Sequence, residues 1–287
     1  LRHYQADSHL YAWLEAKEID FDLITDRELH EEGVDSIRDY KALCTGSHPE
    51  YHTPQTLDAL QYYRDQGGRL VYLGGNGFYW KIALSPEDPE LIEIRRGESG
   101  IRAWAAEPGE YYHSFDGSYG GLWRRNGRPP QLLAGVGFSA QGKFEGSYYR
   151  RTAQSRAPDL AWMFEGIEDQ EILGDFGFSG GGAAGFELDR ADVRLGTPEE
   201  VRVVASSENH TSSFVLVPEE MLTHITNWPG EEEQQKLIRS DIVYFRTPSG
   251  GEVFSTGSIT FCGSLPWNDF DNNISRLLEN VIRRFLQ

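Results

Sequence analysis

The first hundred residues alternate between strand-like and helical segments, and this alternation restricts the fold more than any other feature of the 287-residue chain. Apolar runs at 41–45 and 69–73 are typical of strands. Between them, Thr-Pro at 53–54 predicts a helix start, because threonine caps helices and proline suits the first helical position. Gly-Gly at 67–68 predicts the end of that helix. Strands alternating with helices are typical of βαβ units, so we predict an α/β fold with a mostly parallel sheet.

Regular elements are also expected on both sides of this unit. An apolar stripe at Leu10, Trp13 and Leu14 predicts a first helix. Residues 21–25 predict a strand, and Asp26 is placed to cap a short helix after it. Later strands are predicted at 201–205, 214–217, 242–246, 252–254 and 258–262.

The C-terminal part carries a hairpin signal and a helix signal. Pro-Ser-Gly-Gly at 248–251 separates two of these strands, which predicts a turn between antiparallel partners. Apolar residues recur at helical spacing from Ile274 to Phe285 and predict an amphipathic helix, with Asp271 or Asn272 as its cap.

Residues 97–158 interrupt the pattern. They are rich in glycine, arginine and tyrosine, and they show no helical period and only weak alternation. Such a stretch predicts an irregular or β insertion of loops and short hairpins. Its function would be that of a lid or a partner-binding surface. We therefore predict a single domain over residues 1–287 with an insertion at about 97–158.

Charge and cysteine content exclude several classes of protein. The chain has 27 basic and 45 acidic residues, a formal charge of −18, which excludes a nucleic-acid binder and docking on anionic membranes. No apolar run approaches the ~20 residues that span a bilayer. Cys44 and Cys262 are too few for a disulfide framework, so we expect buried, reduced thiols and a cytoplasmic protein.

Polar side chains gather directly after the strand at 41–45. His48, Glu50, Tyr51 and His52 lie within five positions, and ligands of open α/β sheets bind beyond the carboxyl ends of the strands. The alternative is a polar loop that merely leads into the next helix. A zinc pair of His48 and His52 is disfavoured, because that spacing needs both residues on one helical face and the helix is expected to start at 53.

A second loop, Gly-Gly-Asn-Gly at 74–77, has the layout of a nucleophile elbow. Its central residue, Asn76, is no useful nucleophile, but its amide can donate a hydrogen bond to a carbonyl or oxyanion. The alternative is a tight turn in which asparagine tolerates left-handed geometry.

A third glycine-rich segment, 180–185, matches G-x-G-x-x-G, but no helix is predicted after it, so a dinucleotide site is disfavoured. Its glycines could instead bring the backbone close to a site and present Glu187 or Asp175. The alternative is that both acids are exposed or pair with Arg190 and Arg194.

Together these segments resemble the large (beta) subunit of the N,N-dimethylformamidase family, in its carboxyl-terminal domain. The motifs that carry the resemblance are Phe-Asp-Leu-Ile-Thr-Asp at 21–26, Gly-Ser-His-Pro-Glu-Tyr at 46–51, Leu-Gly-Gly-Asn-Gly-Phe-Tyr-Trp at 73–80, Gly-Phe-Glu-Leu-Asp-Arg at 185–190 and Leu-Gly-Thr-Pro at 195–198. The resemblance covers essentially the whole chain. It implies a three-layer, glutamine-amidotransferase-like α/β fold and the carboxyl-terminal part of a longer subunit.

The resemblance also implies an activity, the hydrolysis of a small tertiary formamide to formate and a dialkylamine. The family looks like a mononuclear ferric enzyme whose iron is held by two tyrosines and one glutamate. Glu50 matches the glutamate ligand, His48 a nearby histidine, and Asn76 and Glu187 active-site residues. An active-site lysine of the family falls near Arg95 or Arg96.

On this resemblance, both ligand tyrosines belong upstream of Leu1, and Tyr51 and Tyr79 are less favoured substitutes. Iron would activate water and polarise the carbonyl as a Lewis acid. His48 would orient Glu50 or move a proton, Asn76 would bind the substrate oxygen, and Glu187 would act as a base or orient the water. A small partner subunit and a homo- or hetero-oligomer are implied as well.

Two other classes of function stay open. One is a non-catalytic binding or assembly domain, which the acidity of the chain favours. The other is a carbohydrate-related protein, because amidotransferase-like domains occur in sugar metabolism and Tyr111, Tyr112, Trp104 and Trp123 could stack on sugar rings.

Overall fold

A large curled sheet forms the centre of the molecule in a computed structural model that describes residues 3–88, 90–97, 107–217 and 230–287. The strand order is β1-β3-β11-β10-β8-β6-β7, and β9 also pairs with β6. The strands are β1 (Leu43–Cys44), β3 (Arg69–Tyr72), β6 (Gly137–Arg151), β7 (Ala184–Arg190), β8 (Arg202–Glu208), β9 (Val215–Leu216), β10 (Asp241–Arg246) and β11 (Glu252–Ser255).

The sheet is mixed, so the prediction of a mostly parallel sheet is wrong. Only β1–β3 and β3–β11 pair in parallel. The pairs β10–β11, β8–β10, β6–β8, β6–β7 and β6–β9 are antiparallel. A parallel pair needs a crossover of a dozen or more residues. The chain provides one between β1 and β3, whereas the short turn 247–251 between β10 and β11 permits only an antiparallel pair.

Helices cover both faces of this sheet. They are α1 (Tyr4–Ala16), α2 (Asp26–Glu32), α3 (Pro54–Asp65), α4 (Pro130–Ala134), α6 (Glu231–Leu237) and α7 (Asn273–Phe285). Successive residues of a strand point to opposite faces. Ile242 therefore joins the core under α1 and α7, whereas Val243 joins the core under α3. The Trp13 indole N–H donates to Ser275 Oγ at 2.8 Å and ties α1 to α7.

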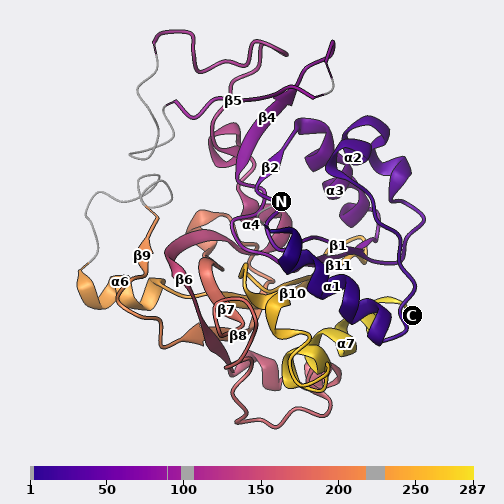
Figure 1. The fold of residues 1–287 in the computed structure, drawn as a ribbon, viewed down its shortest axis with the longest axis vertical. Coiled ribbons are helices and arrows are strands. Elements are labelled where there is room, and N and C mark those ends of the chain that lie inside the picture. Colours follow the sequence, from indigo (N-terminus) through magenta and orange to yellow (C-terminus); the bar gives the residue numbers. More distant parts are fainter. Residues whose placement is uncertain (1–2, 89, 98–106, 218–229) are drawn as a thin grey trace.

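A smaller sheet stands beside the large one, with the order β2 (Tyr51–His52), β4 (Trp80–Leu84) and β5 (Ile92–Ile94). Figure 1 shows it projecting above the main sheet, next to α2 and α3. Strands β2 and β4 pair in parallel, with Tyr51 opposite Trp80. Both therefore begin at the junction between the two sheets.

Three capping and turn predictions are confirmed. Helix α3 begins at Pro54, and Thr53 Oγ1 accepts a hydrogen bond from the Thr56 amide at 3.2 Å. Asn272 caps α7 in the same way, through the Ser275 amide at 2.9 Å. Strands β10 and β11 form the predicted hairpin.

Two predicted strands are wrong. Residues 21–25 form no strand, and Thr25 rather than Asp26 caps α2. Residues 258–262 form a turn that leads into a short 3-10 helix, Phe261–Ser264. The hydroxyl of Ser258 accepts from the Thr260 amide at 3.2 Å. This local bond competes with strand pairing.

The expected insertion is more regular than predicted. Residues 98–106 of it lie outside the described residues, but from 137 onward the chain forms β6, a strand of fifteen residues. The pairing of β6 with β7 shifts register between Phe138 and Ala140 and again between Gln141 and Gly146. Bulges of this kind change which side chains face the core. They therefore hide the period-2 pattern of a strand in the sequence.

No helix among the described residues is long and apolar enough to cross a bilayer. Cys262 is buried as expected, whereas Cys44 is only partly buried, and both are free thiols. Burial raises the pKa of Cys44 to about 12 and also raises that of Cys262. Neither thiol is therefore poised as a nucleophile.

Glu93 on β5 holds a loop of the insertion at residues 114–115. Its Oε1 accepts from the Ser114 amide at 3.0 Å and its Oε2 from the Phe115 amide at 3.0 Å. Burial raises the pKa of Glu93, but these bonds, the Ser114 hydroxyl and Arg95 outweigh it and hold the pKa at about 2. A carboxylate with a lowered pKa stabilises the fold above its unfolded pKa, and this contribution is lost as pH falls toward 2.

We expect Glu93→Gln to lower the free energy of unfolding at pH 7 by up to about 3 kcal/mol, since one pKa unit corresponds to ~1.4 kcal/mol. The variant should also lose stability less steeply than the wild type between pH 4.5 and 2. Urea unfolding at several pH values measures both effects. Glu232→Gln, at an exposed helical position, is the control. If the free energy of unfolding falls equally steeply with pH in the wild type and in Glu93→Gln over this range, Glu93 does not have the lowered pKa assigned to it.

Candidate functional site

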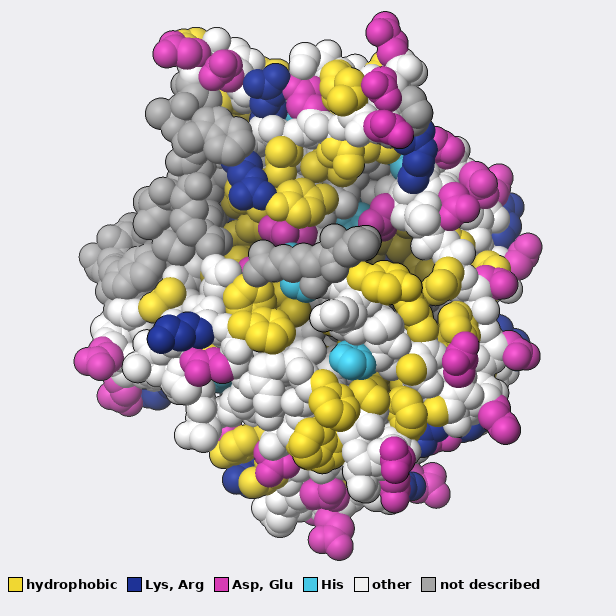
Figure 2. Space-filling view, in the orientation of Figure 1, with side chains coloured by type: hydrophobic (Ala, Val, Ile, Leu, Met, Phe, Trp, Pro, Cys, Tyr) yellow, Lys and Arg dark blue, Asp and Glu magenta, His cyan; other side chains and the backbone are white. Residues whose placement is uncertain are grey.

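Four residues singled out in the sequence meet in one polar pocket of about 270 Å³. His48 and Glu50 follow β1, Asn76 follows β3, and Glu187 lies on β7. The pocket is lined by His3, His48, Glu50, Tyr51, Asn76, Tyr79, Trp80, Arg96, Phe186 and Glu187. Figure 2 shows acidic and histidine side chains in a hollow between hydrophobic ones on this face.

The amide of Asn76 bridges the two carboxylates. Its Nδ2 donates to Glu50 Oε1 and to Glu187 Oε2, each at 3.2 Å. Its Oδ1 is buried and has no hydrogen-bond partner among the described residues. Because both amide hydrogens are engaged, Asn76 cannot also donate to a substrate oxygen, as we expected from the sequence, without releasing a carboxylate. The acceptor Oδ1 is the free end of this side chain.

His48 lies against the same two carboxylates. Its Nε2 is 2.9 Å from Glu50 Oε2, and its Nδ1 is 3.0 Å from the Gly75 carbonyl oxygen and 3.6 Å from Glu187 Oε2. Burial lowers the pKa of His48, but the hydrogen bond to Glu50 and the charges of Glu187 and Glu50 outweigh it, so the pKa is raised. Both ring nitrogens face acceptors, which favours the doubly protonated imidazolium.

Two glycines allow these loops to meet. A Cβ on Gly74 would lie 2.5 Å from the Ser47 carbonyl oxygen, and a Cβ on Gly75 would lie 2.5 Å from the Glu187 carbonyl oxygen. Asn76 has φ 53°, a left-handed conformation that asparagine adopts more readily than most residues. The tight-turn interpretation of 74–77 is therefore correct, and this turn also carries Asn76 into the pocket.

Tyr51 and Tyr79 both line the pocket, but their side chains have different surroundings. The Tyr51 hydroxyl accepts a hydrogen bond from the Arg96 guanidinium, and burial and Glu50 raise its pKa more than Arg96 lowers it. Tyr79 is buried, with its ring edge-on to Trp80 and Phe138.

Arg96, the second arginine near the family's lysine position, also lines the pocket and stacks over Trp80 at 4.6 Å. Arg95 instead forms an ion pair with Glu93 at 2.6 Å. Of these two arginines, it is therefore Arg96 that places its positive charge at this pocket.

Several alternatives fail on geometry. His52 turns away from His48, toward Thr56 Oγ1 at 3.1 Å and the Pro49 carbonyl oxygen at 3.0 Å. Among the described residues no group of three or more His, Cys, Asp or Glu side chains is arranged to hold a metal. The glycines of 180–185 lead into β7 rather than a helix, and Asp175 is exposed.

Three residues of the site were not predicted from the sequence: His3 and Phe186 line the pocket, and Gln141 contacts Glu187 from beside it. Gln141 on β6 donates to Glu187 Oε1 at 2.9 Å, and it pairs directly opposite Glu187 in the sheet. The ring of His3 lies 4.6 Å from that of His48. Phe186, at φ 63°, precedes Glu187. Only the register of β6 on β7 could have pointed to Gln141, and β6 itself was missed.

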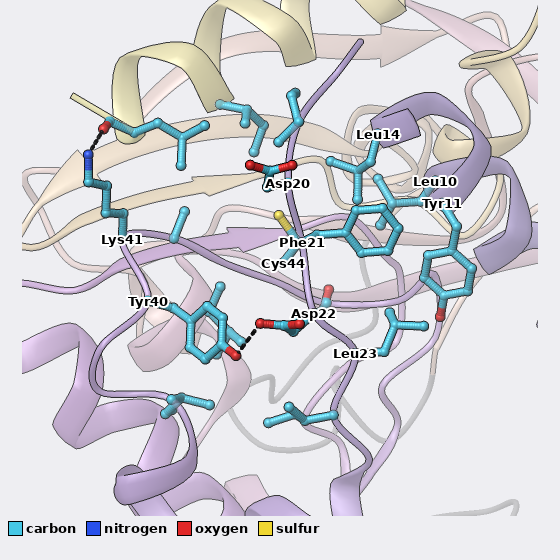
Figure 3. A pocket seen from close by; sticks show the side chains of 18 of the residues that line it. Leu10, Tyr11, Leu14, Asp20, Phe21, Asp22, Leu23, Tyr40, Lys41 and Cys44 are labelled. Carbon is cyan, nitrogen blue, oxygen red and sulfur yellow. Dashed lines mark hydrogen bonds between the residues drawn. The ribbon is translucent and has the colours of Figure 1, made fainter. Parts of the chain in front are cut away.

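A larger pocket of about 340 Å³ lies elsewhere, between α1, the segment before α2, β1 and the end of α7. Figure 3 shows that aliphatic and aromatic side chains form most of its wall. At its rim the Tyr40 hydroxyl donates to Asp22 at 2.6 Å, and Lys41 donates to the Leu286 carbonyl. Because its wall is mostly apolar, the smaller, polar pocket is the candidate for chemistry.

Comparison with known proteins identifies the family of the chain. Residues 1–273 match the family model described as N,N-dimethylformamidase beta subunit-like, C-terminal. The chain is 42% identical over 282 residues to the N,N-dimethylformamidase beta subunit of Paracoccus aminophilus, and 41% identical over 282 residues to that of an Alcaligenes species. The match covers 98% of this chain but 37% of each relative. Because the family model matches nearly the whole chain and the identity is 42%, the chain belongs to the N,N-dimethylformamidase beta subunit-like family and corresponds to the C-terminal region of that subunit.

Proposed function

We propose that this chain supplies catalytic residues for the hydrolysis of a small amide of the N,N-dimethylformamide type, giving formate and a dialkylamine. The observation that carries the proposal is the pairing of Glu50 and Glu187 through the Asn76 amide, with His48 against both. Amide hydrolysis needs a base for water and an acid for the leaving amine. A carboxylate and an imidazolium in one small pocket supply this pair.

Each residue has a role that its contacts support. Glu187 would take the proton of the attacking water, and the buried Oδ1 of Asn76 would accept that water's other hydrogen. His48 would hold Glu50 in place through Nε2 and return a proton to the leaving nitrogen. The pocket volume of about 270 Å³ suits a small substrate.

An iron ion is part of this proposal. Carboxylate and phenolate oxygens are hard donors, and Glu50 lines the pocket with Asn76 on Oε1 and His48 on Oε2. A carboxylate has about four acceptor sites, so these bonds leave room for a metal. Glu50 would hold a mononuclear ferric ion. When bound, this ion would supply a Lewis acid that polarises the carbonyl and lowers the pKa of water.

The tyrosine ligands would come from outside residues 1–287. Tyr51 is the weaker candidate within the chain, because its hydroxyl faces the positive charge of Arg96. Tyr79 stays a less favoured substitute.

The proposal extends to assembly. The chain spans 37% of the length of the relatives, which are named beta subunits. We therefore propose that it works as the carboxyl-terminal part of a longer subunit in an oligomer, with a small partner subunit. We also propose, from the sequence, a glutamine-amidotransferase-like fold and a cytoplasmic location. A sugar-binding role has less support, because Trp123 is buried and, of its aromatic candidates, Tyr112 is exposed. Trp104 lies outside the described residues.

The first test replaces Glu50 by glutamine in the protein purified from its native host with all associated chains. Because glutamine keeps the shape but is a poor iron ligand, we expect iron content to fall at least tenfold and formate release to fall with it. Elemental analysis and a formate assay measure the two. Glu252→Gln is the matched control, since Glu252 is also a buried, hydrogen-bonded glutamate but lies on β11. Full iron content in Glu50→Gln would overturn the ligand assignment.

The second test replaces Glu187 by glutamine in the same preparation. Removing a general base lowers kcat by about 10²–10⁴-fold, and the iron should stay because Glu187 is not its ligand. Steady-state kinetics and iron content separate this outcome from that of Glu50→Gln. A kcat within a factor of about three of the wild type would exclude Glu187 as the base.

A further inference from the structure

Asn76 is held at two places, by its side chain and by its backbone. The side-chain amide bridges Glu50 and Glu187 from a turn in which the backbone at Asn76 is left-handed, with φ 53°. The side-chain contacts belong to the site already described. The backbone contacts involve two other residues, Asp189 and Tyr72.

Asp189 and Tyr72 form a closed set of hydrogen bonds around the turn. The Asn76 amide N–H donates to Asp189 Oδ1 at 2.7 Å. The Tyr72 hydroxyl donates to Asp189 Oδ2 at 2.8 Å and accepts from the Gly77 amide N–H at 2.8 Å. Two successive amides of the turn are thus satisfied by one carboxylate and one phenol. Both side chains are fully buried.

One strand therefore contacts Asn76 at both ends. Residues two apart on a strand share a face, so Glu187 and Asp189 on β7 both point toward the turn. Glu187 accepts from the side-chain amide of Asn76, and Asp189 accepts from its main-chain amide. A displacement of the turn along β7 would break both contacts together.

The buried carboxylate is unfavourable unless its bonds are kept. Burial raises the pKa of Asp189 to about 8, against the bonds from the Asn76 amide and the Tyr72 hydroxyl, with Glu187 raising it further and His48 lowering it. Within the described part of the chain, the carboxyl group of Asp189 is hydrogen-bonded by the Asn76 amide and the Tyr72 hydroxyl, and neither donor carries a charge. These two donors therefore favour the ionised form of Asp189, against the effect of burial.

We propose that Asp189 and Tyr72 are positioning residues that set the Asn76 amide between Glu50 and Glu187. They act through the backbone of 76–77 and do not line the pocket themselves. The kinetic consequence rests on the proposed function, whereas the effect on the turn does not.

The test compares Tyr72→Phe with Tyr244→Phe in the full-length protein with its associated chains. Tyr244 is the matched control, because it is also buried and its hydroxyl donates to a carboxylate, Glu252, at 2.7 Å. We expect amide hydrogen exchange at residues 76 and 77 to accelerate at least tenfold in Tyr72→Phe and to stay unchanged in Tyr244→Phe. In the same variant kcat should fall by about 10–100-fold with little change in KM.

A double variant separates positioning from general loss of stability. If Tyr72 acts through Asn76, then Tyr72→Phe should lower kcat in the wild-type background but not in an Asn76→Ala background. Asp189→Asn is a second variant for the same double-mutant comparison, because it keeps the shape of the side chain and removes one of the two carboxylate acceptors. It should reproduce both the exchange and the kinetic effects of Tyr72→Phe.

The outcomes are distinguishable. Unchanged exchange at 76–77 in both Tyr72→Phe and Asp189→Asn would overturn the inference, and so would a kinetic effect that persists in the Asn76→Ala background. A wild-type protein without amidase activity would overturn the proposed function alone. In that case the exchange measurements still decide whether Asp189 and Tyr72 hold the turn.

Discussion

The close approach of the turn 74–77 to strand β7 is the constraint on which the rest of the site depends. Gly75 lies so near the Glu187 carbonyl that any side chain there would collide with it. This contact brings the end of a parallel strand against an antiparallel strand from the other half of the chain. Glu50 and Glu187, 137 positions apart in the sequence, can then share one asparagine amide.

The electrostatics of the pocket follow from that geometry. Two carboxylates face each other in a protein of formal charge −18, and the nearby charges that offset them are His48 and, at the rim, Arg96. The Asn76 amide separates the two acids and donates to both. The same negative field raises the pKa of His48 against burial. A site of this kind favours a bound cation and an acid–base pair over a nucleophilic side chain, consistent with thiols that are buried or engaged elsewhere.

Sequence motifs correctly predicted those helices and turns that are specified by neighbouring residues. Thr53-Pro54, the hairpin turn at 248–251 and the apolar stripe of α7 each contain their own capping or packing information. The prediction of a mostly parallel sheet was wrong, because a βαβ pattern in the first part of the chain says nothing about the pairing of later strands. Strand β6 was missed because its bulges interrupt the alternation that sequence patterns detect.

The sequence by itself determined the family and the residue types of the site, since His48, Glu50, Asn76 and Glu187 stand in motifs with recognisable spacing. Only the tertiary structure decided how they are connected. It engages both hydrogens of the Asn76 amide, turns His52 away, selects Arg96 over Arg95, and adds Gln141 and Asp189. The physical reason is that hydrogen bonds between distant segments depend on strand register and on close backbone approach, and a linear pattern specifies neither.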